Sequence, residues 1–303
     1  MTGGVVAIVN AKAGGATDPQ QQEELAARIH AALPAAQVVF AGENEDVTAL
    51  AREAVSNGAG LVIAGGGDGT INSVVTAVAG TETVLGVLPM GTLNHFARDL
   101  GIPADPDAAL AVIAAGHVAP VDTGEVNGRA FINNSALGLY PGIVGLTERA
   151  ASRPRRFKRL TRMLRLVAAT ARVLARYHLL RIRVDSQGRQ RTRTTPAVFI
   201  GNNEYVMEGL KAGTRQRLDD GQLLVVIAHQ RRALPLLWSG LRHLAGFRKR
   251  PDDFERVSVT ELRIETHHRH LDVTLDGELL RLEAPLHYRI RPGALRVAVP
   301  APD

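Results

Sequence analysis

Short apolar runs and helix-like patterns alternate along the first part of the chain. The runs are rich in β-branched residues, as in buried strands, whereas the segments between them place apolar residues on one helical face. Asp18 and Pro19 mark the start of one such helix, and Gly58 follows the end of another. The alternation predicts an α/β doubly wound domain with a parallel sheet, to which we assign residues 1–123. The predicted elements are strands 4–9, 37–40, 61–64 and 84–88 and helices 18–32, 45–57, 71–78 and 105–116.

The pattern changes at the end of this domain, after which short β-rich runs dominate. Val257 and Val259, then Leu262 and Ile264, alternate with polar residues, which is typical of strands with one face in water. We expect residues 124–303 to form a C-terminal antiparallel β-sandwich domain, whose last strand is free to pack back on the first domain. The predicted strands are 131–134, 179–185, 196–201, 223–228, 257–266, 271–275, 287–291 and 295–299.

A glycine cluster, Gly65-Gly66-Gly67-Asp68-Gly69-Thr70, follows the third strand and precedes a helix. This order of elements presents backbone N–H groups and the positive end of a helix to an anion, and glycine allows a ligand to approach the backbone closely. A carboxylate such as Asp68 repels phosphates unless it meets a metal or a hydroxyl proton. The loop therefore predicts a nucleotide triphosphate site with a metal or a proton acceptor nearby. The alternative is a tight turn that uses glycine for geometry alone.

Two common phosphate-binding motifs do not fit this loop. A Walker A motif needs Lys where Gly69 stands, and the dinucleotide motif needs a third Gly where Thr70 stands. Two further loops, 10–15 and 89–98, follow the first and fourth predicted strands. Because ligands of doubly wound sheets bind beyond the carboxyl ends of the strands, we expect the three loops to converge.

The glycine cluster resembles the signature of the diacylglycerol kinase catalytic-domain family, which includes bacterial lipid kinases and sphingosine kinases. Its Gly-Gly-Asp-Gly core is shared with NAD kinases. Asn10 to Gly14 resembles the family's first nucleotide loop, and Pro89-x-Gly91-Thr92-x-Asn94 resembles its third. The resemblance implies ATP as the cofactor. The implied ATP-binding residues are Asn10, Ala11, Lys12, Ala13, Gly14, Gly66, Gly67, Asp68, Gly69, Thr70, Ile71, Asn72 and Thr92.

Two acidic turns in the second half extend the resemblance. Residues 218–223 are similar to the family's structural metal segment, which implies a Mg²⁺ site formed by Asp220 and the backbone carbonyls of Arg217 and Gln222. The turn at 276–278 is similar to the family's Asp-Gly-Glu, which implies that Glu278 accepts the proton of the lipid hydroxyl while Asp68 shares the catalytic work. From spacing alone, both segments are equally typical of hairpin turns.

One position departs from the family pattern. Family members usually carry Asp after the Asn of the third loop, and this chain has His95. That Asp belongs to a carboxylate–water–metal network in the lipid kinases, and we consider Asp99, one helical turn on, as a substitute. Asp122 also resembles a family acid, with burial or a turn as its alternative role.

Charge and composition point to an anionic partner. The formal net charge is +6, the sequence pI is about 10.1, and there is no cysteine. One Trp, four Tyr and seven Phe are few for a protein that stacks bases, so we expect no nucleic-acid partner. Residues 153–177 form a basic amphipathic pattern, typical of a membrane-surface helix or of a connecting helix with solvated arginines. No apolar run approaches the ~18 residues of a spanning helix.

These observations predict a cytoplasmic, peripherally membrane-associated kinase that moves the γ-phosphoryl group of ATP to a hydroxyl of diacylglycerol or a related lipid. The active site is expected in a cleft between the two domains. An NAD kinase and a catalytically inactive nucleotide- or lipid-binding homologue remain the alternatives. The lipid is expected at an anionic membrane surface, and a homodimer is left open.

Overall fold

A computed structural model describes most of the chain. None of the helices in its described part has the length and apolar character needed to cross a membrane. The basic stretch 153–177 lies outside the described residues. The described ranges are 3–13, 18–43, 45–138, 179–186, 189–205, 214–215, 217–228, 254–266 and 268–301.

The chain divides into two compact units, and neither is a single continuous segment. The first unit comprises Met1–Asn133, Asn202–Gly221 and Ile290–Asp303. The second comprises Asn134–Gly201 and Gln222–Arg289. The backbone therefore passes from one unit to the other four times.

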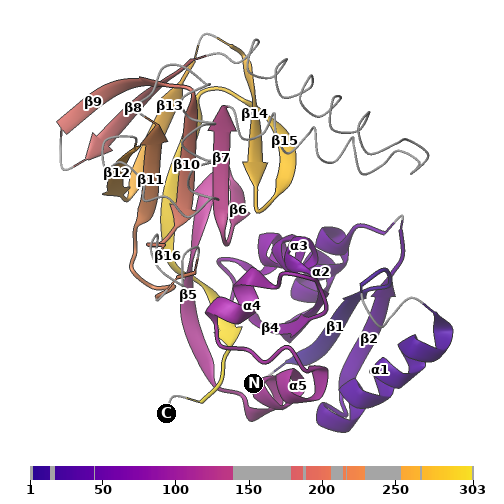
Figure 1. The fold of residues 1–303 in the computed structure, drawn as a ribbon. Coiled ribbons are helices and arrows are strands. Elements are labelled where there is room, and N and C mark those ends of the chain that lie inside the picture. Colours follow the sequence, from indigo (N-terminus) through magenta and orange to yellow (C-terminus); the bar gives the residue numbers. More distant parts are fainter. Residues whose placement is uncertain are drawn as a thin grey trace, which may run out of the picture. The chain divides into compact units, whose positions relative to one another are not determined.

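A parallel sheet forms the centre of the first unit (Figure 1). Its central strands, β3 and β4, are nearly all buried and rich in valine, isoleucine and leucine, as expected when helices cover both faces. The last residues of the chain extend the sheet, because Arg296 and Val297 pair in parallel with Val84 and Leu85. The strands, in spatial order, are β2 (Ala36–Ala41), β1 (Gly4–Asn10), β3 (Ala59–Gly66), β4 (Val84–Pro89) and the end of β16 (Leu286–Ala298).

Four helices pack on this sheet in two pairs. Helix α1 (Pro19–Ala32) contacts α5 (Pro106–Ala115), and α2 (Val47–Ser56) contacts α3 (Asp68–Val78). Each helix buries an apolar stripe, so that Ile29, Ala51, Val74 and Ile113 are fully buried. Burying a branched side chain such as that of Ile29, Val74 or Ile113 contributes about 1.5–3 kcal/mol to folding, which outweighs the weak helix propensity of β-branched residues.

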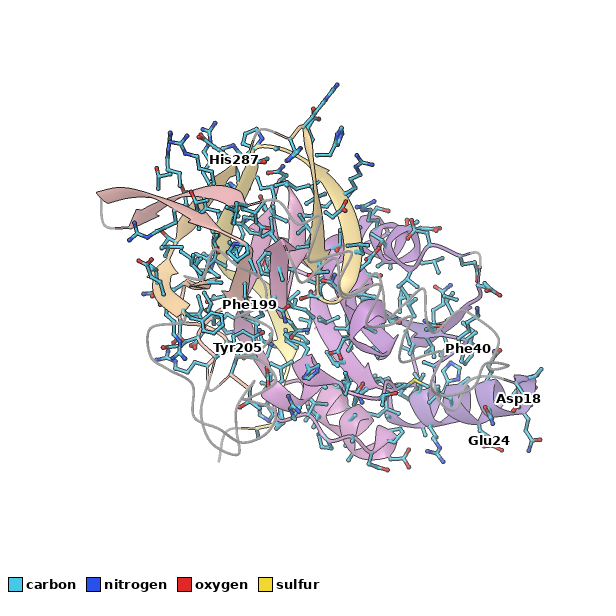
Figure 2. All side chains as sticks on the ribbon, turned by 45° about the horizontal axis from the view of Figure 1, so that its top comes forward. Asp18, Glu24, Phe40, Phe199, Tyr205 and His287 are labelled. Carbon is cyan, nitrogen blue, oxygen red and sulfur yellow. The ribbon has the colours of Figure 1, made fainter. Side chains whose placement is uncertain are left out.

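Three of the four helices have an aspartate as their N-cap residue. The side chains of Asp18, Asp46 and Asp105 accept hydrogen bonds from first-turn backbone N–H groups at 3.0, 2.9 and 2.9 Å. Figure 2 shows Asp18 at the exposed beginning of α1. Such caps satisfy N–H groups that have no partner within the helix and contribute about 1 kcal/mol each.

Smaller elements complete the first unit. Strands β5 (Val118–Val126) and β6 (Arg129–Phe131) form a hairpin whose turn residues, Asn127 and Gly128, have φ of +46° and +81°. Positive φ at both central positions is the geometry of a type I′ turn. A five-residue helix, α4 (His95–Asp99), follows the loop after β4.

The second unit is built from antiparallel strands in two sheets. The buried hydroxyls of Ser135 and Tyr288 lie 2.9 Å apart and join β7 of one sheet to β16 of the other. The first sheet has the order β12 (Phe254–Val259), β11 (Leu223–Ala228), β10 (Ala197–Asn202), β7 (Asn134–Gly138), β14 (His270–Leu275) and β15 (Glu278–Glu283). The second has the order β9 (Arg189–Thr195), β8 (Leu180–Ser186), β13 (Glu261–Glu265) and the beginning of β16.

The predicted fold class is confirmed, with differences at individual elements. The predicted strands 287–291 and 295–299 are one strand, β16, because Pro292 and Gly293 do not end it. Gly293 has a φ of +57°, and the buried side changes there, from residues 286, 288 and 290 to residues 295 and 297. This change of face is what an inserted bulge residue produces. The predicted strand 257–266 is two strands, β12 and β13, and the predicted strand 131–134 covers only the end of β6 and the beginning of β7. The elements α4, β5, β9 and β15 were not predicted.

Candidate functional site

The predicted loops lie at the point where the order of the parallel strands reverses. Strand β1 stands between β2 and β3, so the chain leaves β1 toward one side of the sheet and returns to β3 on the other. Loops at the carboxyl ends of two such strands diverge and leave a crevice where ligands of doubly wound sheets bind. The loops after β1 and β3 are Asn10–Ala13 and Gly66–Thr70.

Asn10 joins the first two loops. Its side-chain amide donates to the Thr70 hydroxyl at 3.1 Å, and its side-chain oxygen accepts from the backbone N–H of Lys12 at 2.9 Å. The ammonium of Lys12 is exposed and lies 2.6 Å from the carboxylate of Glu43. Gly14, the last predicted residue of this loop, lies outside the described residues.

The N-terminus of α3 differs from the N-termini of α1, α2 and α5. Its N-cap residue is Gly67, so no side chain caps the N–H groups of the first turn. A Cβ atom at Gly66 would lie 2.5 Å from the Thr70 hydroxyl oxygen, whereas a Cβ atom at Gly69 would meet nothing within 4 Å. The turn is therefore closely packed behind Gly66 and open at Gly69. Uncapped N–H groups together with the helix dipole can bind a phosphate.

Ile71 and Asn72, also predicted to bind nucleotide, continue α3. Ile71 is fully buried, and its N–H donates to the Gly67 carbonyl at 3.1 Å, so its side chain belongs to the core. The side-chain oxygen of Asn72 is buried and has no hydrogen-bond partner. Asn72 therefore carries a buried acceptor without a hydrogen-bond partner in the second turn of the helix.

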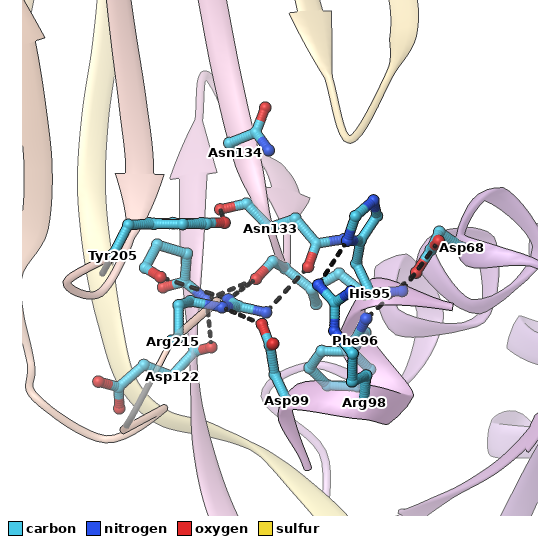
Figure 3. A network of polar contacts seen from close by, with 12 residues as sticks. Asp68, His95, Phe96, Arg98, Asp99, Asp122, Asn133, Asn134, Tyr205 and Arg215 are labelled. Atoms are coloured by element: carbon cyan, nitrogen blue, oxygen red, sulfur yellow. Dashed lines mark hydrogen bonds and ion pairs between the residues drawn. The ribbon is translucent and has the colours of Figure 1, made fainter. Parts of the chain in front are cut away.

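Asp68 holds the loop that follows β4. One carboxylate oxygen accepts from the N–H of His95 and the other accepts from the N–H of Phe96, each at 3.2 Å (Figure 3). The carboxylate thus binds the first turn of α4 rather than its own helix. This contact accounts for an acidic residue among the glycines, because it fixes α4 against the beginning of α3.

Glycine is required where the second and third loops touch. A Cβ atom at Gly91 would lie 2.5 Å from the Cα atom of Gly67. The third loop is closed by Asn94, at φ +46°, whose side chain accepts from the Gly91 N–H and donates to the Gly91 carbonyl, both at 2.9 Å. The predicted Thr92 is exposed within this loop. The three loops therefore meet in the first unit, as their positions after parallel strands predict.

His95 occupies the position where the family usually has aspartate. Arg98 Nη2 lies 3.0 Å from His95 Nδ1. Because arginine can only donate, this contact selects the imidazole tautomer whose proton is on Nε2. Asp99 does not substitute for the missing carboxylate beside Asp68, since its side chain is buried and paired with Arg215.

The predicted metal segment is a polar turn with one carboxylate at the predicted ligand position. Arg217 Nε lies 3.1 Å from Asp219 and 3.3 Å from Asp220, and its hydrogen bond lowers the pKa of Asp219. Within the described ranges, no three His, Cys, Asp or Glu side chains gather as a metal site. One carboxylate with backbone carbonyls is a donor set that suits Mg²⁺, and the Arg217 guanidinium competes for that carboxylate.

Asp122 anchors this turn. Its two carboxylate oxygens accept from the backbone N–H groups of Gly221 at 2.7 Å and Gly293 at 2.8 Å, and the residue is buried. Asp122 therefore joins the predicted metal segment to β16 within the first unit, which agrees with a role in a turn.

Glu278 lies at the tip of a hairpin in the second unit. The turn residues Asp276 and Gly277 have φ of +48° and +91°, as in a type I′ turn. Asp276 exchanges two hydrogen bonds of 2.8 Å with the backbone of Asn134 on β7. The carboxylate of Glu278 is exposed. The turn is thus fixed by Asp276 and leaves Glu278 open to a substrate.

A buried residue that no motif predicts is also part of the first unit. Arg215 contacts Asp99, the end of β10 and the two residues between β6 and β7, and its side chain is fully buried. Nothing in the sequence distinguishes a buried arginine in a polar segment from a solvated arginine. The burial of Arg215 could therefore not be predicted.

Comparisons with known proteins cover both halves of the chain. Residues 4–126 match the family model of the diacylglycerol kinase catalytic domain, and residues 141–299 match that of the YegS C-terminal NAD kinase beta sandwich-like domain. A protein of Pseudomonas aeruginosa PAO1 named "Probable lipid kinase YegS-like" is 34% identical over 264 residues, which are 86% of this chain and 83% of the relative. A protein of Staphylococcus aureus JH9 named "Diacylglycerol kinase" is 32% identical over 187 residues, 61% of this chain and 58% of the relative.

A solved structure shares the fold. The crystal structure of a diacylglycerol kinase from Bacillus anthracis str. Sterne has a TM-score of 0.67 and is 22% identical, with 98% of this chain and 96% of that chain covered. At this identity the likeness concerns the arrangement of the backbone.

Proposed function

The chain belongs to the diacylglycerol kinase catalytic domain family, and from this we propose that it is a lipid kinase that transfers the γ-phosphoryl group of ATP to a lipid hydroxyl. Diacylglycerol or a related lipid is the proposed acceptor. The observation that carries the proposal is the uncapped beginning of α3, which opens at Gly69 between the Asn10 loop and the Gly91–Asn94 loop.

Each loop has a distinct proposed role toward the triphosphate. The first-turn N–H groups of α3 bind phosphate oxygens, and the exposed Thr92 hydroxyl donates a further hydrogen bond. Lys12 adds positive charge at the edge of the site. Asp68 positions α4 and the third loop, a role that its two hydrogen bonds to backbone N–H groups support.

Phosphoryl transfer depends mainly on positioning and on charge neutralisation. In the proposal, the Glu278 carboxylate accepts a hydrogen bond from the lipid hydroxyl and takes its proton late in the transfer. Its exposure at the tip of a fixed hairpin supports this role. Mg²⁺ held by Asp220 and the backbone carbonyls of Arg217 and Gln222 would supply positive charge that orders this turn.

We also propose that the enzyme visits anionic membrane surfaces, where its lipid substrate resides. The net charge of +6 supports this, because a basic protein is attracted to acidic lipids. Binding to vesicles with and without phosphatidylglycerol, measured by sedimentation at low and high salt, tests the proposal. Equal binding to both vesicle types would contradict it.

The direct test is phosphorylation of lipid by the purified protein. Mg-ATP labelled in its γ-phosphate is incubated with mixed micelles of diacylglycerol, a sphingoid base or phosphatidylglycerol, and the products are identified by mass analysis. The proposal predicts a labelled phospholipid. Formation of NADP from NAD would support an NAD kinase instead, and ATP binding without any labelled product would support an inactive homologue.

Replacing Glu278 by Gln tests the assignment of the proton acceptor. The Glu278→Gln variant keeps the shape of the side chain but cannot accept a proton, so kcat should fall by about 100-fold or more while ATP binding stays unchanged. Glu283→Gln, on the same strand and also exposed, is the matched control and should keep its activity. A Glu278→Gln enzyme with normal kcat would exclude this role.

A further inference from the structure

Arg215 forms a buried ion pair with the end of α4. Its Nε atom lies 2.8 Å from a carboxylate oxygen of Asp99, and the two side chains are 0% and 3% exposed. The other carboxylate oxygen of Asp99 is buried without a hydrogen-bond partner. Arg215 is therefore the group that compensates the Asp99 charge, and removing either partner would leave an unpaired charge in the interior.

The remaining guanidinium N–H groups bind a set of fixed acceptors. Nη1 donates to the carbonyls of Ile132 and Asn202, and Nη2 donates to the side-chain oxygen of Asn133 at 2.8 Å (Figure 3). The ring of Tyr205 lies 5.5 Å from the guanidinium carbon, and its hydroxyl donates to the Asn133 carbonyl at 2.9 Å. We call Asp99, Arg215 and these four residues the Arg215 network.

The acceptors of the Arg215 network are held independently of Arg215. The side-chain amide of Asn202 donates to the carbonyls of Asp122 at 2.8 Å and of Ile132 at 3.0 Å. A planar guanidinium with several fixed acceptors has a single position, unlike a flexible ammonium. The position of Asp99, which Arg215 holds, is therefore fixed as well.

Helix α4 is thus held at both ends. At its beginning the N–H groups of His95 and Phe96 bind the Asp68 carboxylate, and at its end Asp99 binds Arg215. The buried side chains of Phe96 and Ala97 anchor its middle. A helix of five residues has little stability of its own, so these contacts decide where it lies. The Gly91–Asn94 loop leads directly into α4 and shares its position.

We propose that Arg215 is a positioning residue of the nucleotide site. By fixing Asp99, it holds α4 at the distance at which Asp68 can bind both N–H groups, and it thereby keeps the Gly91–Asn94 loop against Gly67. The inference rests on the proposed function only in taking ATP as the ligand of these loops. It assigns a role in nucleotide binding to a residue that lies behind the site, outside the glycine motif.

The test compares Arg215→Lys and Asp99→Asn with a control that is destabilised elsewhere in the first unit. Lysine keeps the charge but cannot reach all the acceptors, and asparagine keeps an oxygen but loses the charge. The control is Ile29→Ala, which empties a buried position on α1, a helix that packs on α5 and β2. All proteins are compared at a temperature where circular dichroism shows them fully folded.

Two measurements separate positioning from stability. MgATP dissociation constants from calorimetry should rise about tenfold or more in Arg215→Lys and Asp99→Asn, but less than twofold in Ile29→Ala. Hydrogen exchange of peptides covering residues 91–99 should be faster in the first two variants and unchanged in the third. Unchanged ATP affinity and unchanged exchange in a folded Arg215→Lys protein would overturn the inference.

Further outcomes are also decisive. If Arg215→Lys does not fold, Asp99→Asn, which keeps an acceptor for Arg215, provides the same two measurements. A wild-type protein that binds MgATP but phosphorylates no lipid would refute the proposed function and leave this inference standing. A wild-type protein that does not bind MgATP would overturn both.

Discussion

At the scale of single residues, the ammonium group of Lys12 already forms an ion pair within the protein. Glu43 lies 2.6 Å from its ammonium, and both side chains are exposed. The hydrogen bond from Lys12, together with its charge, lowers the pKa of Glu43 from its ordinary value of 4.5. A phosphate at this loop would therefore compete with Glu43 for Lys12.

Replacing Glu43 by Gln should release Lys12 to the nucleotide. We expect the KM for MgATP to fall by up to about fivefold at low salt, and the gain to disappear at high salt. Because the folded-state pKa of Glu43 is lowered, its pairing is complete above its ordinary pKa and is lost as the pH falls through the lower value. The effect should thus be independent of pH near neutrality and should fade as the pH falls through the lowered pKa of Glu43. Glu24→Gln, on α1, is the control for charge alone; an equal change of KM there would contradict the prediction.

Gly69 is a second single residue with a testable role. A Cβ atom there meets no protein atom within 4 Å, so Gly69→Ala should fold normally and gain up to about 1 kcal/mol from helix propensity. The added methyl group would nevertheless occupy the space proposed for phosphate. We expect MgATP affinity to fall about tenfold or more while the free energy of unfolding from urea titration stays the same or rises.

Gly4→Ala provides the comparison for Gly69→Ala, because a Cβ atom at Gly4 also meets nothing within 4 Å and lies outside the loop. It should change neither quantity. If Gly69→Ala binds MgATP as tightly as the wild type, the beginning of α3 is not the phosphate site.

At the residue scale, the role of a residue could be predicted from the sequence only where a short local motif defines that role. Gly91 and Asp68 each belong to a short motif whose spacing limits the possible geometry. A Cβ atom at Gly91 would meet Gly67, and both carboxylate oxygens of Asp68 accept hydrogen bonds. Arg215 acquires its role mainly through residues far away in the sequence, such as Asp99 and Asn133. No periodicity or spacing in the sequence carries that information.

At the scale of elements, the turn of residues 217–222 combines a proposed metal ligand with a competing cation. The Arg217 guanidinium contacts Asp219 and Asp220, and the turn is fixed from behind by Asp122. Because the proposed ligand from Arg217 is its backbone carbonyl, its side chain can be changed without removing a ligand.

Arg217→Gln should strengthen Mg²⁺ binding. Removing the guanidinium leaves the Asp220 carboxylate free for the cation, so the Mg²⁺ dissociation constant should fall about three- to tenfold in calorimetry. Arg263→Gln, which removes an exposed arginine paired with Glu265 in the second unit, is the matched control. Weaker Mg²⁺ binding in Arg217→Gln would argue against a metal at this turn.

Elements were predicted best where the hydrophobic period was undisturbed. Apart from the five-residue helix α4, the order of strands and helices up to α5 was predicted correctly, because polar or glycine residues separate the apolar runs. β16 was divided in two because Pro292-Gly293 has the composition of a turn, and in the structure Gly293 instead shifts the register of a continuing strand. β9 was missed because Arg189–Thr195 is polar throughout and has no apolar face to detect.

At the scale of the whole molecule, the first unit is assembled from three separate pieces of the chain. Each of the two later pieces supplies an interaction partner for residues of the first piece. Arg215, on the second piece, neutralises the buried Asp99, and the end of β16, on the third, pairs with β4 and buries Leu295 and Val297. Residues 1–133 alone would lack all of these partners.

A fragment of residues 1–133 should therefore fail to fold stably, although it contains the three nucleotide loops. We expect no cooperative thermal transition by circular dichroism and no MgATP binding by calorimetry, because β4 becomes an exposed edge and Asp99 an unpaired buried charge. Adding residues 202–221 and 290–303 through flexible linkers should restore a transition. A fragment of residues 1–133 that folds and binds MgATP would contradict this account.

The four passages of the backbone between the units also bear on how such a protein can evolve. A unit encoded by one uninterrupted stretch can be exchanged between genes as a block, but here any single crossover would split the first unit, and one within residues 134–289 would split both units. New acceptor specificities are thus expected to arise by point substitution within the second unit, and the two units to be inherited together.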